Sequence, residues 1–363
     1  MENESFNSFK QNEDPFETGG LNPDPEKLIP KYQVSKPILK SLVGQSIISV
    51  KQFDKPLVVQ VSKLAALLQA TEIASSHPLD GNIIITAFFE ASTRTRLSFE
   101  SAVLRLDGKV LSIADGQTTG IAKGESLEDI GEMFNAYGDA VIMRHIETEA
   151  IDEILKKLRL PLINAGNGTG EHPTQALADW YALLKWRPDL ADDDLSDKKK
   201  IHLGIIGTPG SMRAVKSFLY MSLLFKDAIQ KISIISEMAD PLGEELTDEL
   251  NQSQLEYEIL LDINDVLSDL DVIYMNSITF LGDSYKSLDK RFKLHAGSAL
   301  KKSAVVMHPL ARLDELSTSL DSTDHNLYFT QAHGATFVRQ ALLLSILDRL
   351  ERLPSVILSN IVS

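Results

Sequence analysis

Residues 82–89 read NIIITAFF, and residues 90–96, which follow directly, read EASTRTR. The first run is short, β-branched and aromatic, and it comes after Asp80-Gly81, so it predicts a buried strand. The second run is rich in hydroxyl groups and arginines, and a segment with helical character, residues 97–106, follows it. Strand, loop and helix in this order favour an α/β fold.

The alternation of buried strands and helices continues along the chain. Further strands are predicted at residues 109–113, 140–143, 161–164, 201–207, 231–235, 271–274 and 304–307. Helices are predicted at residues 58–71, 127–137 and 338–350. Such buried strands are typical of parallel sheets covered on both faces. We therefore expect two doubly wound parallel-sheet domains, with the active site in the cleft between them.

The chain of 363 residues is longer than one hydrophobic core usually organises. The charged, proline-containing stretch at 187–200 (RPDLADDDLSDKKK) marks a surface connection near the domain boundary. The predicted division is a flexible N-terminal extension (1–43), a first domain (44–187), a second domain (188–336) and a C-terminal helix (337–363) that packs back on the first domain.

Composition excludes several classes of function. The net charge of −15 argues against a nonspecific nucleic-acid binder, and the absence of cysteine excludes disulfides and thiolate chemistry. No run of about 18 apolar residues suggests a membrane span. The first residues resemble neither a secretory signal nor a transit peptide, so we expect a cytoplasmic location, with no membrane or nucleic-acid partner.

The loop at 90–96 offers a site for an anion. The start of a helix favours negative charge, hydroxyl groups of Ser92, Thr93 and Thr95 donate hydrogen bonds, and Arg94 and Arg96 suit phosphate. The alternative interpretation is an ordinary capped helix with two surface arginines.

Two further strand ends point to the same place. Arg144 follows the strand at 140–143. It has two interpretations: it binds the same anion, or it is an ordinary solvated arginine. Residues 166–175 (GNGTGEHPTQ) follow the strand at 161–164, and there His172 either donates to a carbonyl oxygen or caps the next helix. Gln175, one turn later, can accept a hydrogen bond from an amide. Because carboxyl ends of parallel strands share one edge, the three loops converge on one crevice.

Four stretches together resemble the aspartate and ornithine carbamoyltransferase family. They are FFEASTRTRLSFE (88–100), MRH (143–145), GNGTGEHPTQAL (166–177) and MHPLARLDE (307–315). The resemblance covers about residues 44–350. Glu90-Ala91, and the lack of a cysteine after His308, favour its aspartate branch.

The resemblance implies transfer of the carbamoyl group of carbamoyl phosphate to the amino group of L-aspartate, a step of pyrimidine synthesis. It implies no cofactor, no metal and no protein nucleophile. Glu90 would hold arginines in the closed state, and the implied catalytic residues are Arg94, Thr95, Arg144 and His172. The implied carbamoyl phosphate contacts are Ser92, Thr93, Arg94, Thr95, Arg144, His172, Gln175 and Leu310.

Family members are homotrimers in which a loop of one subunit reaches the active site of its neighbour. Residues 118–125 (TTGIAKGE) match that loop, with Thr119 in place of the usual serine and Lys123 in the position of the lysine. The alternative for Lys123 is a solvated loop lysine. The resemblance leaves regulatory or other pathway subunits open.

The acceptor side departs from the family pattern. Arg213 matches the arginine that grips the amino-acid carboxylate, but Ser277 and Thr279 stand where an arginine and a glutamine are expected. Ala311 replaces a proline that follows a cis bond, so we expect a trans bond there and a displaced Leu310 carbonyl. Three readings remain: a compensating cation (Lys286, Lys290 or Arg291), a different amino acid or amine as acceptor, or an impaired partner subunit.

Overall fold

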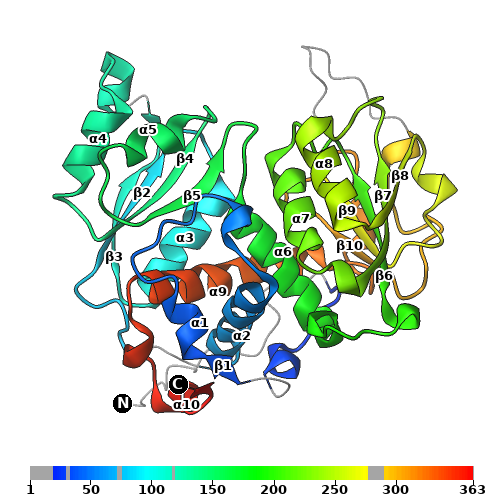
Figure 1. The fold of residues 1–363 in the computed structure, drawn as a ribbon, viewed down its shortest axis with the longest axis horizontal. Coiled ribbons are helices and arrows are strands. Elements are labelled where there is room, and N and C mark those ends of the chain that lie inside the picture. Colours follow the sequence, from blue (N-terminus) through cyan, green and yellow to red (C-terminus); the bar gives the residue numbers. More distant parts are fainter. Residues whose placement is uncertain (1–18, 30–32, 72–75, 117–118, 277–289, 363) are drawn as a thin grey trace, which may run out of the picture.

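The structure is a computed structural model, and it describes residues 19–29, 33–71, 76–116, 119–276 and 290–362. Two parallel sheets with helices on their faces make up the molecule and lie side by side (Figure 1). This arrangement is the α/β fold of two parallel-sheet domains that the strand pattern predicts. In these residues, no helix combines the length and apolarity that crossing a membrane requires.

The first sheet has four parallel strands in the order β3-β2-β4-β5. They are β2 (Ile83–Phe88), β3 (Lys109–Ile113), β4 (Ala140–His145) and β5 (Leu162–Asn167). Ile84 and Phe88 of β2 pack into the core with helices α2 (Lys55–Ala70), α3 (Thr93–Arg105) and α6 (Pro173–Trp186). Ile85 and Ala87 pack on the opposite face with α4 (Leu127–Phe134) and α5 (Ala150–Leu155). A strand buried on both faces is expected to be mostly apolar, and NIIITAFF is apolar except at Asn82 and Thr86.

The second sheet has five parallel strands in the order β10-β9-β6-β7-β8. They are β6 (Ile201–Ile206), β7 (Ile229–Ile235), β8 (Glu256–Leu260), β9 (Val272–Met275) and β10 (Val305–Met307). Helices α7 (Arg213–Leu223) and α8 (Gly243–Ser253) cover the face that joins the large central core. A separate cluster that includes Ile206, Ile273 and Tyr328 fills the other face.

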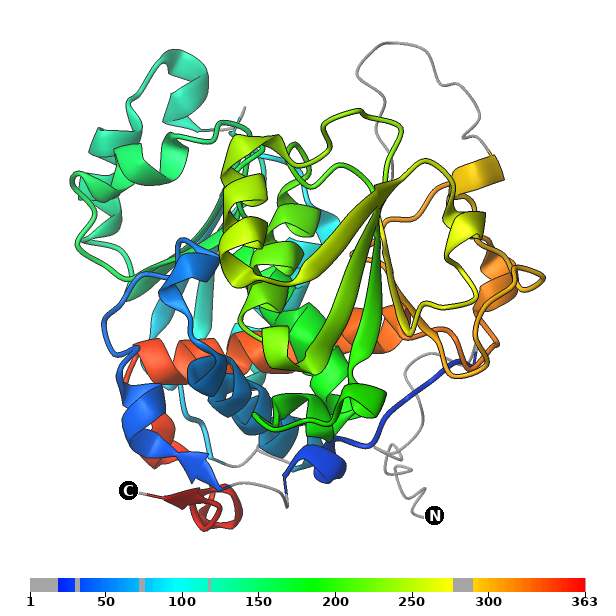
Figure 2. The same ribbon diagram turned by 45° about the vertical axis from the view of Figure 1, so that its right-hand side comes forward.

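One long helix, α9 (Tyr328–Ile346), joins the two halves. It leaves the second sheet region at Tyr328 and then packs against α2, α3 and α6 of the first half (Figures 1 and 2). The helix therefore starts earlier than the sequence predicts, and the expected boundary between residues 336 and 337 falls inside it.

The described part of the N-terminal extension packs on the body of the protein. Leu28 in the 3-10 turn η1 (Pro25–Leu28) is fully buried, and the Leu21 amide donates to the Asn326 carbonyl at 2.9 Å. Farther on, β1 (Val34–Ser35) pairs with β11 (Ile361–Val362), and α1 (Lys36–Lys40) follows. The expectation of flexible attachment was wrong for these residues, because the extension supplies apolar side chains to the core.

Candidate active site

A cavity of about 330 Å³ lies where the two halves meet. Its walls come from the start of α3, the end of β4, the β5–α6 loop, the start of α7, the segment after β10, and α9. The lining residues are Ser92, Arg94, Thr95, Ser98, Arg144, Gly168, His172, Gln175, Ser211, Met212, Arg213, Ala214, Asn276, His308, Pro309, Leu310, Gln331, Ala332, Ala335 and Arg339.

The three loops singled out in the sequence are thus brought together around one cavity. Eight of the thirteen residues predicted for the site line it: Ser92, Arg94, Thr95, Arg144, His172, Gln175, Arg213 and Leu310. Thr93, Thr119 and Lys123 are not among the lining residues. Ser277, Thr279 and Lys286 lie outside the residues that the structure describes.

The start of α3 presents hydroxyl and amide donors to the cavity. Ser92 occupies the N-cap position, but its side chain makes no capping hydrogen bond, so its hydroxyl is left for the cavity. The first turn contains no acidic residue, and burial lowers the pKa of Arg94. Arg96, in contrast, donates from Nη1 to Glu100 Oε1 at 3.3 Å and to Ser112 Oγ at 3.4 Å. The sequence suggested Arg96 as a second phosphate ligand, and that was wrong because Arg96 pairs one turn along its own helix.

Glu90 links two arginines of the cavity. Its Oε1 accepts from Arg144 Nη2 at 2.8 Å and from Arg213 Nη2 at 2.6 Å, and its Oε2 accepts from Arg213 Nη1 at 2.9 Å. Burial alone would raise the pKa of Glu90, but hydrogen bonds from Arg213 and the charges of both arginines outweigh it and lower that pKa. A charged Glu90 therefore fixes one arginine from each half of the molecule.

Arg144 is buried, and the interpretation of it as a solvated arginine is wrong. Its side chain is 12% exposed, and burial lowers its pKa, helped by the nearby charge of Arg213. The absence of a side chain at Gly166 leaves room for the guanidinium groups of Arg144 and Arg213. The φ of Gly166 is +113°, and a Cβ there would lie 3.1 Å from Arg213 Nε and 3.3 Å from Arg144 Nη1. A side chain at this position would crowd both guanidinium groups.

His172 lines the cavity as a neutral imidazole. It sits at the N-cap of α6, but its side chain makes no capping hydrogen bond, whereas its backbone amide donates to Ser217 Oγ at 2.8 Å. Burial and then the charges of Arg144, Arg339 and Arg213 hold its pKa well below the usual value. A neutral imidazole donates from one nitrogen without carrying charge, which suits a carbonyl oxygen as partner.

The sequence did not point to Arg339. This residue of α9 is 2% exposed, its guanidinium lies 4.4 Å from the centre of the Phe99 ring, and its Nε has no hydrogen-bond partner among the described residues. Burial lowers its pKa to about 9. The one signal was an arginine inside the apolar run at 337–344 (FVRQALLL). An uncompensated buried cation on a cavity wall favours an anion inside.

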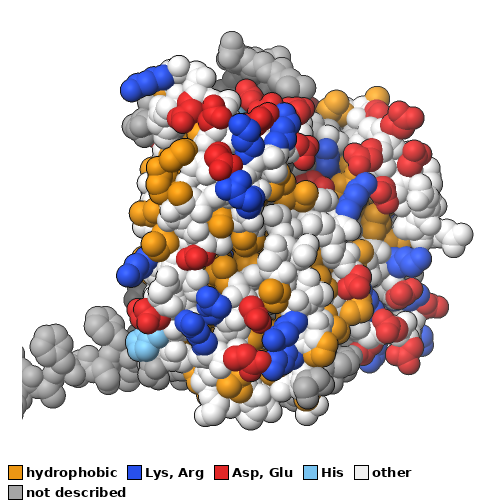
Figure 3. Space-filling model, turned by 60° about the vertical axis from the view of Figure 1, so that its left-hand side comes forward, with side chains coloured by type: hydrophobic (Ala, Val, Ile, Leu, Met, Phe, Trp, Pro, Cys, Tyr) orange, Lys and Arg blue, Asp and Glu red, His pale blue; other side chains and the backbone are white. Residues whose placement is uncertain are grey.

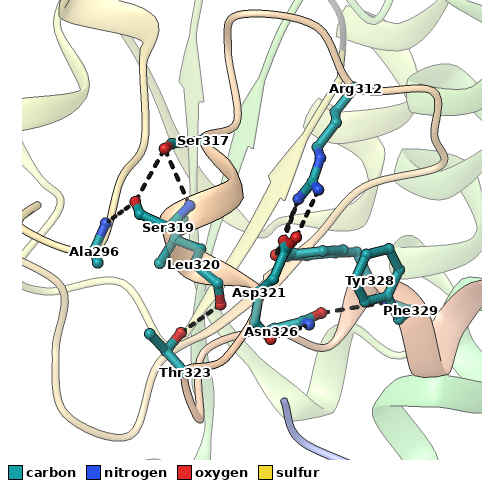
Figure 4. Close-up of polar contacts among 10 residues, drawn as sticks. All are labelled: Ala296, Arg312, Ser317, Ser319, Leu320, Asp321, Thr323, Asn326, Tyr328 and Phe329. Atoms are coloured by element: carbon teal, nitrogen blue, oxygen red, sulfur yellow. Dashed lines mark hydrogen bonds and ion pairs between the residues drawn. The ribbon is translucent and has the colours of Figure 1, made fainter. Parts of the chain in front are cut away.

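The acceptor side of the cavity is formed by the start of α7, Asn276 and residues 308–310. The peptide bond between Leu310 and Ala311 is cis, so the expectation of a trans bond was wrong. Contacts on both sides hold this segment. The Leu310 amide donates to His308 Nδ1 at 2.8 Å, and Arg312 pairs with Asp321, beside Tyr328 (Figure 4).

The loop predicted to reach a neighbouring subunit lies beyond β3. Thr119 caps the 3-10 turn η4 (Gly120–Lys123), its hydroxyl donates to the Gly116 carbonyl at 2.7 Å, and Lys123 is exposed. Neither side chain lines the cavity of its own chain.

Comparison with known proteins agrees with this geometry. Residues 45–185 match the family described as aspartate/ornithine carbamoyltransferase, carbamoyl-P binding domain, and residues 199–346 match the Asp/Orn binding domain of the same family. The chain belongs to the aspartate/ornithine carbamoyltransferase family.

Individual relatives are similar over most of their length. The chain is 35% identical to the chloroplastic aspartate carbamoyltransferase of Arabidopsis thaliana, over 84% of this chain and 78% of that protein. It is 32% identical to the aspartate carbamoyltransferase catalytic subunit of Methanobrevibacter smithii, over 84% and 96%. Aspartate transcarbamoylase from Trypanosoma cruzi, solved with carbamoyl phosphate and aspartate, superposes with a TM-score of 0.73 at 31% identity, covering 85% of this chain and 98% of that one.

Proposed function

We propose that this chain is an aspartate carbamoyltransferase, which converts carbamoyl phosphate and L-aspartate to N-carbamoyl-L-aspartate and phosphate in pyrimidine biosynthesis. One observation carries the proposal. A single cavity joins a helix start suited to phosphate, a neutral His172 and the Glu90-held pair Arg144 and Arg213. These are the groups that a doubly charged donor with a carbonyl and an anionic acceptor require.

In the proposed reaction, the deprotonated amino group of the acceptor attacks the carbamoyl carbon. Negative charge moves to the carbonyl oxygen, where Arg144 and the N–H of neutral His172 stabilise it. The bond to phosphate then breaks, and the phosphate takes up the amine proton. Ser92, Arg94 and Thr95, which line the cavity, hold the phosphate together with Thr93, which follows Ser92 at the start of α3. Placing both reactants in one cavity removes much of the entropic barrier. The arginines offset the repulsion between the two anions.

The choice of acceptor rests on Arg213 and on a loop beyond the described residues. We assign Arg213 to a carboxylate of the amino acid, because this residue lines the cavity and Glu90 fixes the orientation of its guanidinium. Ser277 and Thr279 remain proposed contacts of the same substrate, and Lys286, Lys290 or Arg291 the compensating cation. The carbonyl of Leu310, a residue that lines the cavity, is the proposed acceptor for the amino group.

We also propose a homotrimer with shared active sites, in which Thr119 and Lys123 enter the neighbour's cavity. Their absence from the cavity of their own chain supports this. So does the outer side of the first half, where hydrophobic side chains gather in patches (Figure 3). Exposed apolar residues of this half are Leu97, Leu104, Leu111, Met133, Tyr137 and Ile146. We further propose a cytoplasmic location, although several relatives are named chloroplastic.

A panel of acceptors tests the proposal. The protein is incubated with labelled carbamoyl phosphate and, separately, L-aspartate, L-ornithine, other amino acids and simple amines, and products are identified by mass spectrometry. N-carbamoyl-L-aspartate as the main product supports the proposal. A different carbamoylated product shows a paralogous transferase, and no product despite binding of carbamoyl phosphate shows an impaired partner subunit.

A further inference from the structure

Asp179 is a fully buried carboxylate of α6 that does not line the cavity. Its Oδ1 accepts from Gln175 Nε2 at 2.7 Å and from Gln331 Nε2 at 2.6 Å, and its Oδ2 accepts from the Tyr274 hydroxyl at 2.9 Å. These partners come from α6, α9 and β9, and none is a cation. Burial raises the pKa of Asp179 to about 7, although the three hydrogen bonds oppose that rise.

A carboxylate oxygen of this kind accepts hydrogen bonds, so each glutamine must turn its NH₂ group toward Asp179. The amide of Gln175 then keeps its oxygen for the cavity that Gln175 lines. Reversing that amide would place an NH₂ group toward the cavity where an oxygen now stands, and would set two hydrogen-bond acceptors, the Gln175 oxygen and Asp179 Oδ1, against each other.

Asp179 fixes the orientation of the Gln331 amide in the same way, and Gln331 contacts the acceptor side of the cavity. With its NH₂ group on Asp179, Gln331 uses its Oε1 to accept from the His308 amide at 2.9 Å. His308 in turn accepts from the Leu310 amide through Nδ1 at 2.8 Å, and its Nε2 lies 2.9 Å from Glu315. A continuous chain of hydrogen bonds therefore runs from Asp179 to the backbone at Leu310.

We propose that Asp179 is a positioning residue that sets the orientation of two glutamine amides at once. Through Gln175 it presents an oxygen to the amide of the carbamoyl donor, and through Gln331 it holds the segment from His308 to Leu310 on the acceptor side. The inference rests on the proposed function, because it takes the amide group of carbamoyl phosphate to be the hydrogen-bond partner of the Gln175 oxygen. Asp179 itself touches no substrate.

Two substitutions of Asp179 separate this role from a purely structural one. In Asp179→Asn, the remaining oxygen still accepts from both glutamines, and the new NH₂ group faces the Tyr274 hydroxyl, which can also accept. KM for carbamoyl phosphate should stay within about threefold of the wild-type value. In Asp179→Leu, both amides lose their common acceptor, and that KM should rise about tenfold or more.

Tyr274→Phe is the matched control, because it removes only the bond to Oδ2 and leaves both glutamines in place. Its KM for carbamoyl phosphate should stay close to that of the wild type. The role of Asp179 is refuted if Asp179→Leu keeps the wild-type KM, or if Asp179→Asn is impaired as much as Asp179→Leu. A wild type that makes no carbamoylated product refutes the proposed function instead.

If Asp179→Leu does not fold, Gln331→Met decides the question. This variant cuts the acceptor-side branch but leaves the bond between Gln175 and Asp179. KM for the amino acid should then rise about tenfold while KM for carbamoyl phosphate stays within about threefold. An equal rise in both constants, or no rise in either, contradicts the inference.

Discussion

Glu90 of the first half and Arg213 of the second are joined by two hydrogen bonds, 2.9 and 2.6 Å long, across 123 residues of sequence. The same carboxylate holds Arg144, so one acidic group aligns cations from both sides of the cavity. A paired arginine with a planar fork keeps its direction, whereas a free one would sample several rotamers.

Glu90→Gln tests this link. The amide has one accepting oxygen and adds a donor that faces arginines, so both guanidinium groups lose their fixed orientation. Because the Glu90 side chain is 24% exposed, we take the low end of the range for a broken charge pair, about 2 kcal/mol, or roughly 30-fold in kcat/KM. The measurement is steady-state kinetics with both substrates.

Glu132→Gln is the control for that prediction. Glu132 also forms a two-bond pair with an arginine, Arg159, at 2.8 and 2.9 Å, but the pair lies on the surface away from the cavity. Its kcat/KM should match the wild type. Equal losses in the two variants would mean that the Glu90 bridge has no special part in the reaction.

Arg339→Met should weaken binding of carbamoyl phosphate while the folded state stays as stable or gains stability. The side chain is buried without a described hydrogen bond at Nε, so removing its charge relieves a desolvation cost, and Met fills a similar volume. We expect the affinity for carbamoyl phosphate, measured by calorimetry, to fall about tenfold or more. The midpoint of urea unfolding should stay unchanged or rise.

Arg349→Met supplies the comparison. Arg349 donates to Asn82 Oδ1 at 3.0 Å and is not a lining residue, so affinity for carbamoyl phosphate should not change. Wild-type affinity in Arg339→Met would show that the buried guanidinium serves only the packing against Phe99.

His172 should make stability depend on pH in a defined window. Its pKa is lower in the folded protein than in the unfolded chain, so folding favours the neutral form. This contribution is fully present above the unfolded pKa of about 6.5 and is lost as the pH falls below it.

His172→Gln should therefore lose less stability than the wild type between pH 8 and pH 5.5, by about 1 kcal/mol in urea unfolding. Burial also lowers the pKa values of His145, His202 and His308, so both proteins should weaken in acid and only their difference reports His172. Parallel curves would contradict a buried, neutral His172.

Leu28→Ala tests the N-terminal segment. Leu28 is fully buried against the core, and truncation leaves a cavity there, so unfolding should become easier by about 2 kcal/mol. Val43→Ala, at a side chain 38% exposed, should change stability much less. Equal effects would show that residues 25–28 contribute little to the fold.

The sequence predicts strands best where both faces of a sheet are covered. In β2, successive residues face opposite helix layers, so every residue of the strand except Thr86 is apolar and the strand is easy to find. The edge strand β8 (Glu256–Leu260) was missed because its sequence, EYEIL, mixes acidic residues with apolar ones. The start of α9 was missed because residues 328–337 (YFTQAHGATF) carry polar residues, two threonines and a glycine.

The loops of the site could be predicted from sequence because they follow strands, and carboxyl ends of parallel strands meet at one edge. The roles of Arg339 and Asp179 could not be predicted from sequence. Each lies inside a helix, and only the packing of α9 against α3 and α6 brings Arg339 to the cavity and Asp179 to Gln331. The contacts around Ala311 could not be predicted either, among them the pairing of Arg312 with Asp321.

The central claim is that the cavity around Arg94 carries out carbamoyl transfer to L-aspartate. The most direct measurement is the initial rate of N-carbamoyl-L-aspartate formation with both substrates at saturation, for the wild type and for Arg94→Ala. We predict steady turnover by the wild type, with one phosphate released per product, and a loss of at least about 100-fold in Arg94→Ala. Absence of N-carbamoyl-L-aspartate from the folded wild type, or an equal rate in Arg94→Ala, would contradict the account.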